Sequence, residues 1–446
     1  VAFDDIGLGF PGQVGTVENG GAPSGGANAG GDIDVDIDGS IFVDGEGNPS
    51  VDLVGLHADV QIDSLDTGGE SAHWQESDTS GYVSIIGDGS VYIEAESRDS
   101  AVNVIGVEVL AEDHVVIDGQ DVLDTAGVLN VSASAFGDGF YAEAQGITVD
   151  LYAEAFESNR VELANLVVDV ESTSYDVGGF ISSGASASGI EVTADLDGTE
   201  DSDFVSLSDS SVAVSARGVG SSADAVGVEI SGQDVSVFAA DIVAEAYAGD
   251  RTGDGFFVGS HGLEVYAEGE VRLGRSDDVN GDLDVWSNVG GDIGAGVTNN
   301  YAFGAFYSRG IYVDGRGDGV DGIYVENTTS TSSIANFGDD VLAGAGLYGI
   351  GLLGSDSKYA VSVMADEGTS PNSEARLYGR SVGIDIDADD ERVVFDGVMA
   401  IGSAYGEVMG GVQGSDGLFF GGPFGLGEDS GSVGTVYVEG MHISSA

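Results

Sequence analysis

The sequence predicts an all-β fold, a parallel β-helix or β-solenoid, and three observations support this prediction. Segments such as residues 32–44 alternate strictly between aliphatic and polar residues, which is the period of a strand with one buried face. No segment carries apolar residues at the i, i+3, i+4 and i+7 positions that an amphipathic helix needs. The strands also recur as an irregular cassette of roughly 30 to 45 residues, a repeat length typical of solenoids, propellers and arrays.

Each cassette holds a short alternating strand, a Gly/Ser/Asp turn, and a second strand that opens with Gly and an aliphatic residue. The connections are long and variable, which favours loops at solenoid corners over the tight hairpins of antiparallel sheets. Sandwich or jelly-roll modules and an outer-membrane barrel remain as alternatives, because their strands alternate too. The first strands begin near Ser90, Val128, Leu166, Val212, Ile242 and Leu283, and the second strands open at Gly106, Gly146, Gly189, Gly227, Gly262 and Gly310.

Composition restricts the classes of partner. The chain has 446 residues with 78 acidic and 12 basic side chains, and its formal charge is −66. Nucleic acid and anionic membranes both require a basic surface, so neither is an expected partner. Such a charge destabilises a compact body unless cations neutralise it. A calcium-loaded extracellular protein and a protein adapted to a saline habitat both fit.

Other features concern the compartment and the class of protein. The chain has no Cys, and its 75 Gly residues follow no Gly-X-Y period, which excludes collagen. No apolar run is long enough to cross a bilayer as a helix, so no transmembrane helix is expected. The chain begins at Val1, which fits a signal peptide that has been removed. We therefore expect an exported protein, extracellular or at the cell surface.

We expect three regions along the chain. Residues 1–31 combine an apolar segment with a Gly-rich linker, residues 32–330 form the solenoid, and residues 331–446 are a Gly- and aromatic-rich continuation or interface region. The apolar segment suits either strand exchange with a neighbouring copy or a cap folded back on its own chain. Its candidate assembly residues are Val1, Phe3, Ile6, Leu8 and Phe10.

The Gly-aliphatic-x-Val-x-Ala strands, such as Gly106-Val-Glu-Val-Leu-Ala, and their Gly/Asp/Ser turns resemble the β-solenoid stalks of secreted bacterial surface proteins. Autotransporter passengers and filamentous-haemagglutinin-type adhesins are the families in question. The resemblance covers about residues 32–330 and is one of style, with no shared motif. It implies export and a role in adhesion or in a surface layer, and it assigns no function to any residue.

Three acidic turns are candidate Ca²⁺ sites, because oxygen ligands at alternate positions in a turn can wrap this cation. The first resembles the start of an EF-hand or dockerin-type loop, but it has Leu283 where those loops need Gly and Val289 at the twelfth position. For each turn, a solvated acidic loop is the alternative. The candidate ligands are Asp278, Asn280, Asp282 and Asp284 in the first turn, Asp195, Asp197, Asp201 and Asp203 in the second, and Asp314 and Asp318 in the third.

The remaining motifs carry weaker signals. Asn327 begins the glycosylation sequon Asn-Thr-Thr. The histidines are scattered, and no zinc motif, nucleophile elbow or phosphate-binding loop occurs. A polysaccharide-active enzyme would need carboxylates such as Asp389, Asp390 and Glu391 beside Arg392, but acidic pairs are abundant here by composition alone.

These observations favour a structural subunit without enzymatic activity. We expect it to self-assemble into a filament, sheath or surface layer with copies of itself as partners and divalent cations as bridges, because unpaired strand edges must be capped or paired. A monomeric adhesin or carbohydrate-binding stalk that contacts cell-surface glycans is the alternative. A β-helix polysaccharide lyase or hydrolase comes third.

Overall fold

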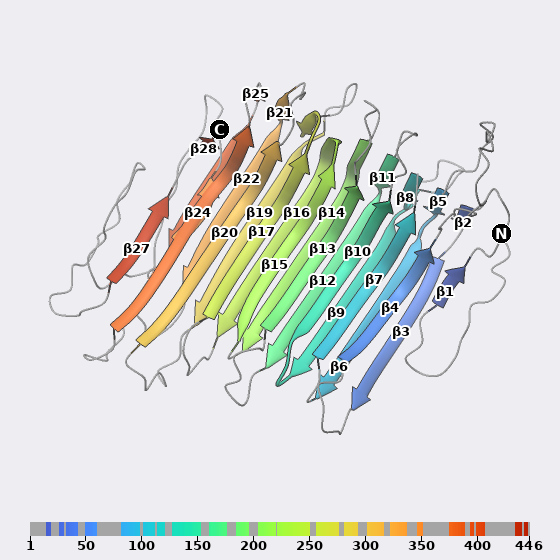
Figure 1. Ribbon diagram of the computed structural model, residues 1–446, viewed down its shortest axis with the longest axis horizontal. Coiled ribbons are helices and arrows are strands. Elements are labelled where there is room, and N and C mark those ends of the chain that lie inside the picture. Colours follow the sequence, from blue (N-terminus) through green and yellow to red (C-terminus); the bar gives the residue numbers. More distant parts are fainter. Residues whose placement is uncertain are drawn as a thin grey trace, which may run out of the picture.

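A computed structural model shows strands lying side by side from the N-terminal to the C-terminal end of the chain (Figure 1). The structure describes residues 15–18, 26–30, 33–42, 50–59, 82–98, 101–111, 114–120, 127–152, 160–175, 184–195, 204–219, 221–249, 256–275, 281–292, 301–315, 322–336, 346–350, 374–388, 393–396, 398–405, 433–438 and 441–444. These ranges contain strands and no helix. The predicted all-β class is therefore confirmed.

The strands form two sheets, which we call sheet A and sheet B. Sheet A contains β1 (Gly15–Glu18), β4 (Ser50–Asp59), β7 (Ala101–Ala111), β10 (Ala142–Tyr152), β13 (Gly184–Asp195), β15 (Ser222–Gly232), β17 (Phe256–Ala267), β20 (Tyr301–Gly315) and β24 (Glu374–Ala388) in this order, and β23 (Gly346–Ile350), β27 (Val433–Val438) and β28 (Met441–Ser444) pair with β24.

Sheet B contains long and short strands. The long ones are β3 (Ile33–Phe42), β6 (Gly89–Arg98), β9 (Leu129–Asp138), β12 (Leu166–Tyr175), β14 (Phe204–Val219), β16 (Asp234–Gly249), β19 (Leu283–Asp292), β22 (Thr328–Asn336) and β26 (Met399–Tyr405). The short ones are β2 (Gly26–Gly30), β5 (Tyr82–Ile86), β8 (His114–Asp118), β11 (Arg160–Ala164), β18 (Val271–Leu273), β21 (Ile323–Glu326) and β25 (Val393–Asp396).

Along most of the chain the strands follow a repeating order: a short strand of sheet B, a long strand of sheet B, then a strand of sheet A. Between β13 and β17 the continuous strands β14 and β16 take the place of the short and long strands. Each strand pairs with its equivalents in the neighbouring repeats, and every pair within the described ranges is parallel. The predicted parallel pairing is confirmed. The short strand is a third element of the repeat that the two-strand cassette did not contain.

The core between the sheets is wide at one end and narrow at the other. At the wide end, large aliphatic side chains such as Ile147, Val149 and Leu163 are buried. At the narrow end, sheet A contributes Ala142 and Ala144 and the facing ends of the long strands contribute small residues such as Ala133, Ala135 and Ala244. Small side chains let the two backbones approach closely, which keeps this end densely packed.

Buried serines join the sheets at the narrow end. Ser287 Oγ of β19 lies 2.9 Å from both Ser260 Oγ of β17 and Ser308 Oγ of β20, and Ser308 Oγ lies 2.5 Å from Ser332 Oγ of β22. Ser260 also donates to the backbone oxygen of Ala244 at 2.8 Å. This serine chain satisfies hydroxyl groups that would otherwise be buried without partners.

A column of glycines runs through the middle of sheet A. The glycine that was expected to open the second strand of each cassette instead lies within the strand, and the burial pattern changes phase there so that two successive residues face the core. A Cβ at Gly106 would lie 2.5 Å from Cγ1 of Val131 and 2.6 Å from the backbone oxygen of Gly146. Only glycine fits, because sheet B side chains pack directly against this backbone.

The bend between short and long strands of sheet B, which in β14 and β16 falls within one continuous strand, uses a left-handed backbone conformation. Asn165, Asp209, Ala239 and Asn327 have φ values of 53°, 47°, 50° and 46°. The amide of Asn165 donates to the oxygen of Ser208 at 3.3 Å, so the pairing between repeats continues through the bend. Asn and Asp tolerate this conformation better than other residues with a Cβ.

Candidate functional site

The outer face of sheet A, whose side chains point away from the core, carries ion pairs and aromatic pairs that link neighbouring strands. Apart from the exposed Asp52, the carboxylates on this face whose burial the structure describes are half-buried or buried, for example Glu143, Glu191 and Glu229, whereas several on the outer face of sheet B, such as Asp241 and Glu245, are exposed. Sheltered charges interact more strongly than solvated ones. We therefore treat the outer face of sheet A as the candidate site.

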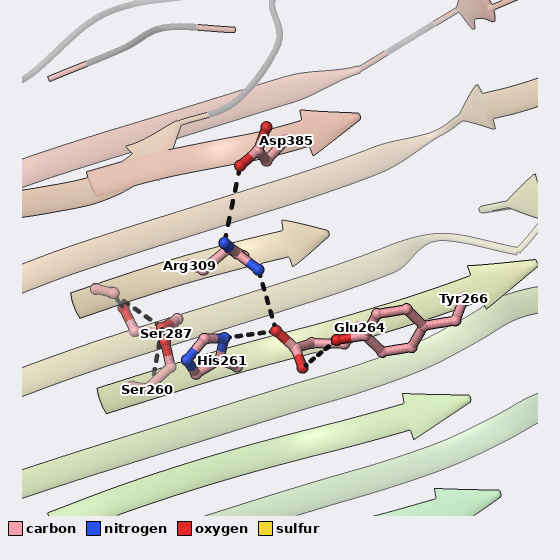
Figure 2. Close-up of polar contacts among 8 residues, drawn as sticks. Ser260, His261, Glu264, Tyr266, Ser287, Arg309 and Asp385 are labelled. Carbon is pink, nitrogen blue, oxygen red and sulfur yellow. Dashed lines mark hydrogen bonds and ion pairs between the residues drawn. The ribbon is translucent and has the colours of Figure 1, made fainter. Parts of the chain in front are cut away.

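Glu264 of β17 is the centre of an ion network on this face (Figure 2). Its Oε1 lies 2.6 Å from Nδ1 of His261 and 3.3 Å from Nη1 of Arg309, and its Oε2 accepts a hydrogen bond from the Tyr266 hydroxyl at 3.3 Å. Nη2 of Arg309 lies 3.9 Å from Oδ2 of Asp385. The network thus joins β17, β20 and β24.

The surroundings of Glu264 hold it ionised. Burial alone would raise the pKa of Glu264, but the hydrogen bond and charge of His261 and the charge of Arg309 lower it below its ordinary value. Since the carboxylate is only an acceptor, the proton of this contact lies on Nδ1 of His261. Burial and the neighbouring charge of Glu264 raise the pKa of Tyr266, which keeps its hydroxyl protonated.

Aromatic rings flank the network. Arg309 lies over the ring of Tyr312, with its guanidinium carbon 4.2 Å from the ring centroid. Tyr266 and Tyr312 form an edge-to-face pair with centroids 5.7 Å apart, and the rings of Phe257 and Tyr307 are 5.4 Å apart. Contacts of both kinds stabilise their partners by about 0.5–1.5 kcal/mol. The side chain of Phe257 nevertheless stays 39% exposed.

The part of the face formed by β7, β10, β13 and β15 has a different character. Lys, Arg and His are absent from the sequences of these four strands. Burial raises the pKa of each of five carboxyl groups here, and repulsion by neighbouring carboxylates raises it further. These groups belong to Glu143, Asp150, Glu191, Asp224 and Glu229. The charge of His261 on β17 opposes this rise for Asp224 and Glu229, and Glu108 of β7 pairs with His57 of β4 at 2.8 Å, so the acidic area is compensated only at its margins.

One register column of this acidic area contains acceptors that lack donors. Asn103, Glu143, Ser186 and Asp224 are successive register partners on β7, β10, β13 and β15. Oδ1 of Asn103 and Oδ1 of Asp224 are buried, and neither accepts a hydrogen bond within the described part of the chain. Unsatisfied buried acceptors are rare in native proteins and cost about 1–3 kcal/mol each.

Gly259 explains the position of Asp224. A Cβ at Gly259 would collide with Oδ1 of Asp224 and would lie 2.8 Å from the Phe257 ring. Gly259 therefore lets the Asp224 carboxylate and the Phe257 ring lie directly over the backbone of β17. The register partner of Gly259 on β20 is Tyr307.

The structure places few of the predicted metal ligands. Asp278, Asn280, Asp197, Asp201, Asp203 and Asp318 lie outside the described residues, as do Val1, Phe3, Ile6, Leu8 and Phe10, and Asp389, Asp390, Glu391 and Arg392. Of the others, Asp282 is exposed before β19, and Asp284 is half-buried within it. Asp195 ends β13, and Asp314 is a buried residue of β20 in register with Tyr266.

Neither the metal nor the glycosylation prediction gains support from these positions. Within the described ranges, no three side chains of Asp, Glu or His are grouped so that they could hold a metal ion. Asn327 is half-buried at a bend of sheet B, where its backbone N–H donates to the backbone oxygen of Asp396 at 3.0 Å. The Ca²⁺ sites and the glycosylation of Asn327 therefore stay predictions.

Sequence reasoning missed the ion network and the acidic column. Their members come from strands far apart in the chain, and only the register of sheet A brings them together. A signal for the position of Glu264 was nevertheless present, since an acidic residue stands two positions after the glycine within the sheet A strand in four repeats. These residues are Glu108, Glu191, Glu229 and Glu264.

The described part of the chain contains no helix that is long and apolar enough to span a membrane. No family model, curated protein or solved structure matches this chain.

Proposed function

We propose that the chain is a β-solenoid that serves as a structural subunit of an extracellular filament, sheath or surface layer, and that it assembles with copies of itself. The observation that carries the proposal is the continuous parallel register. In sheet A it runs from β4 through β24, and in sheet B each long strand from β3 to β26 pairs with the next. A winding chain of this kind would be one elongated scaffold.

Strand edges give such a scaffold a means of assembly. Among the described residues, β1 has a partner on one side only, β4, and β26 likewise pairs only with β22. An open parallel edge presents backbone donors and acceptors at the spacing that another strand needs. Stacking the end of one copy on the start of the next would continue both sheets.

Cations would regulate this assembly. Facing copies would each carry a formal charge of −66, so their approach is repulsive in the absence of counterions. Divalent cations, with Ca²⁺ the expected one, favour carboxylate oxygens and would neutralise facing groups. Monovalent salt would only screen the repulsion.

Electron microscopy and sedimentation velocity test the proposal. The purified chain is compared with calcium, after chelation, and after chelation at high sodium chloride, which separates bridging from screening. Filaments or sheets that form with calcium and dissolve on chelation are the expected result. Monomers under all conditions would overturn the proposal. Polymers that survive chelation only at high salt would show that screening, and not bridging by calcium, permits assembly.

A further inference from the structure

The acidic column and the exposed ring of Phe257 are adjacent on the outer face of sheet A. Asp224 lies over Gly259, against the Phe257 ring, and that ring contacts Tyr307. Carboxylates and aromatic faces are the two groups that proteins use to hold protonated amines, through charge-assisted hydrogen bonds and cation–π contacts. These groups lie on the neighbouring strands β15, β17 and β20.

We propose that the outer face of sheet A binds a linear polysaccharide that carries protonated amino groups, with Asp224, Phe257 and Tyr307 at the centre of the site. This binding is separate from assembly, because it uses the face of the sheet and not its edges.

Hydrogen bonding supports a ligand that donates. The buried Oδ1 atoms of Asn103 and Asp224 accept no hydrogen bond from the described residues, although they lie in one register column. An ammonium group has three donors and no acceptor. A side-chain rotation that brings these oxygens to the surface would let bound amines supply the missing donors, which a ligand rich in carboxylates could not do.

Charge supports a cationic ligand over a neutral or acidic one. Burial and mutual repulsion raise the pKa of Glu143 in this column and of Glu191 and Glu229 on the same face, so an arriving positive charge relieves repulsion that the folded chain already contains. The strands β7, β10, β13 and β15 carry no basic side chain, and the nearest positive group that acts on Asp224 is His261 of β17. A uronic acid polymer would be repelled.

The shape of the face supports a sugar chain over a cationic peptide. Phe257 and Tyr307 offer ring surface beside the carboxylates, and pyranose rings present flat C–H faces to aromatic rings. In the column, polar side chains that can accept hydrogen bonds repeat across strands at the ~4.8 Å spacing of a sheet, and every second one is a carboxylate. A polymer running across the strands would therefore meet one acceptor after another, in the direction of the column from Asn103 to Asp224.

Calorimetric titration of the full chain with short glucosamine oligomers tests the inference at several pH values from mildly acidic to neutral, because the amines lose their charge and the carboxylates gain theirs as pH rises. N-acetylated oligomers, uronate oligomers and oligolysine are the comparison ligands. We expect binding of glucosamine oligomers that exceeds binding of each of the other ligands by roughly tenfold or more. Equal binding of oligolysine would show non-specific attraction to an acidic protein and would overturn the inference, as would equal binding of the acetylated oligomer.

Matched variants locate the site. Asp224→Asn and Phe257→Ala are expected to weaken binding by roughly tenfold and threefold, respectively. Their controls are Asp241→Asn and Trp286→Ala, which alter an exposed carboxylate and an exposed ring on sheet B. An equal loss of binding in the control variants, or no loss of binding in Asp224→Asn, would contradict this location of the site. Circular dichroism of each variant verifies folding, and binding by monomers after chelation separates this result from assembly.

Discussion

Glu229 and Glu264 occupy the same register position on the adjacent parallel strands β15 and β17, yet their pKa values shift in opposite directions. Burial and the charge of Glu264 raise the pKa of Glu229, whereas His261 and Arg309 lower the pKa of Glu264. The boundary between the acidic area and the neutralised network therefore falls between two neighbouring strands.

Substitution of these two residues should have opposite effects on stability. Glu229→Gln removes a charge that faces Glu191 and Glu264, so we expect stabilisation of about 0.5 kcal/mol at neutral pH. Glu264→Gln leaves His261 and Arg309 without their buried counterion, and we expect destabilisation by about 2–4 kcal/mol. Urea denaturation of both variants measures these changes. Effects of the same sign would contradict the assigned electrostatics.

The raised pKa values also predict how stability depends on pH. A carboxyl group with a raised folded-state pKa stabilises the fold most below its unfolded pKa, and this contribution is lost as pH rises through the folded value. Glu143, Asp150, Glu191, Asp224 and Glu229 all belong to this class.

Glu264 acts in the opposite sense, because its contribution is lost as pH falls through its lowered pKa. We therefore expect the thermal midpoint to rise from neutral to mildly acidic pH and to fall again in stronger acid. Glu191→Gln should reduce the rise of the thermal midpoint between neutral and mildly acidic pH. Asp241→Gln, on the exposed outer face of sheet B, should change that rise little. A midpoint that falls steadily from neutral pH would show that these carboxylates do not control stability.

The glycine column leads to a third prediction. Gly106→Ala would place a Cβ against Val131 and the backbone of Gly146, and we expect a cost of about 1–3 kcal/mol from overpacking. Gly184→Ala is the matched control in the same sheet, since its Cβ would lie 3.5 Å from Tyr141, an ordinary contact. Urea midpoints of the two variants should differ clearly. Equal midpoints would mean that the sheets can separate at the column.

The column also shows how far the sequence predicted the fold. Alternation and the repeated Gly-aliphatic pair identified which strands are equivalent, and the structure pairs Val131 with Val168 and Ile147 with Ile190 accordingly. The short strands were missed because five residues such as His114–Asp118 carry too little periodicity to be distinguished from a loop. The strand starts were misplaced because the glycine marks a change of phase within the strand.

The candidate site could be predicted much less well. Its members His261, Arg309 and Asp385 lie on three strands whose register depends on loops of unequal length between them. Composition indicated that carboxylates would be abundant, but it gave no indication of which would be sheltered. The acidic turns drew attention in the sequence because their residues are adjacent in the chain, whereas the ion network is adjacent only in space.

The serine chain at the narrow end of the core leads to a prediction about stability. There, the volume of a side chain should affect stability more than the loss of one hydroxyl group does. Ser287→Ala should cost about 1 kcal/mol, because Ser260 and Ser308 keep their bonds to the backbone oxygens of Ala244 and Ser287. Ser287→Val adds volume where the sheets are closest and should cost more, about 1–3 kcal/mol. Ser215→Ala, on the exposed face of β14, is the control and should stay within about 0.5 kcal/mol. A valine variant as stable as the alanine variant would contradict the narrow core.

The bend of sheet B gives the last prediction, which concerns backbone conformation alone. Ala239 has a φ of 50°, where a residue with a Cβ is disfavoured by about 1–2 kcal/mol. Ala239→Gly removes that strain but adds about 0.4–1 kcal/mol of unfolded-state entropy. We therefore expect a net stabilisation of roughly 0.5 kcal/mol. Ala213→Gly, at an exposed position within β14, should instead destabilise the fold by about 0.5–1 kcal/mol. Urea denaturation distinguishes the two signs, and a loss of stability for both variants would show that the bend does not strain Ala239.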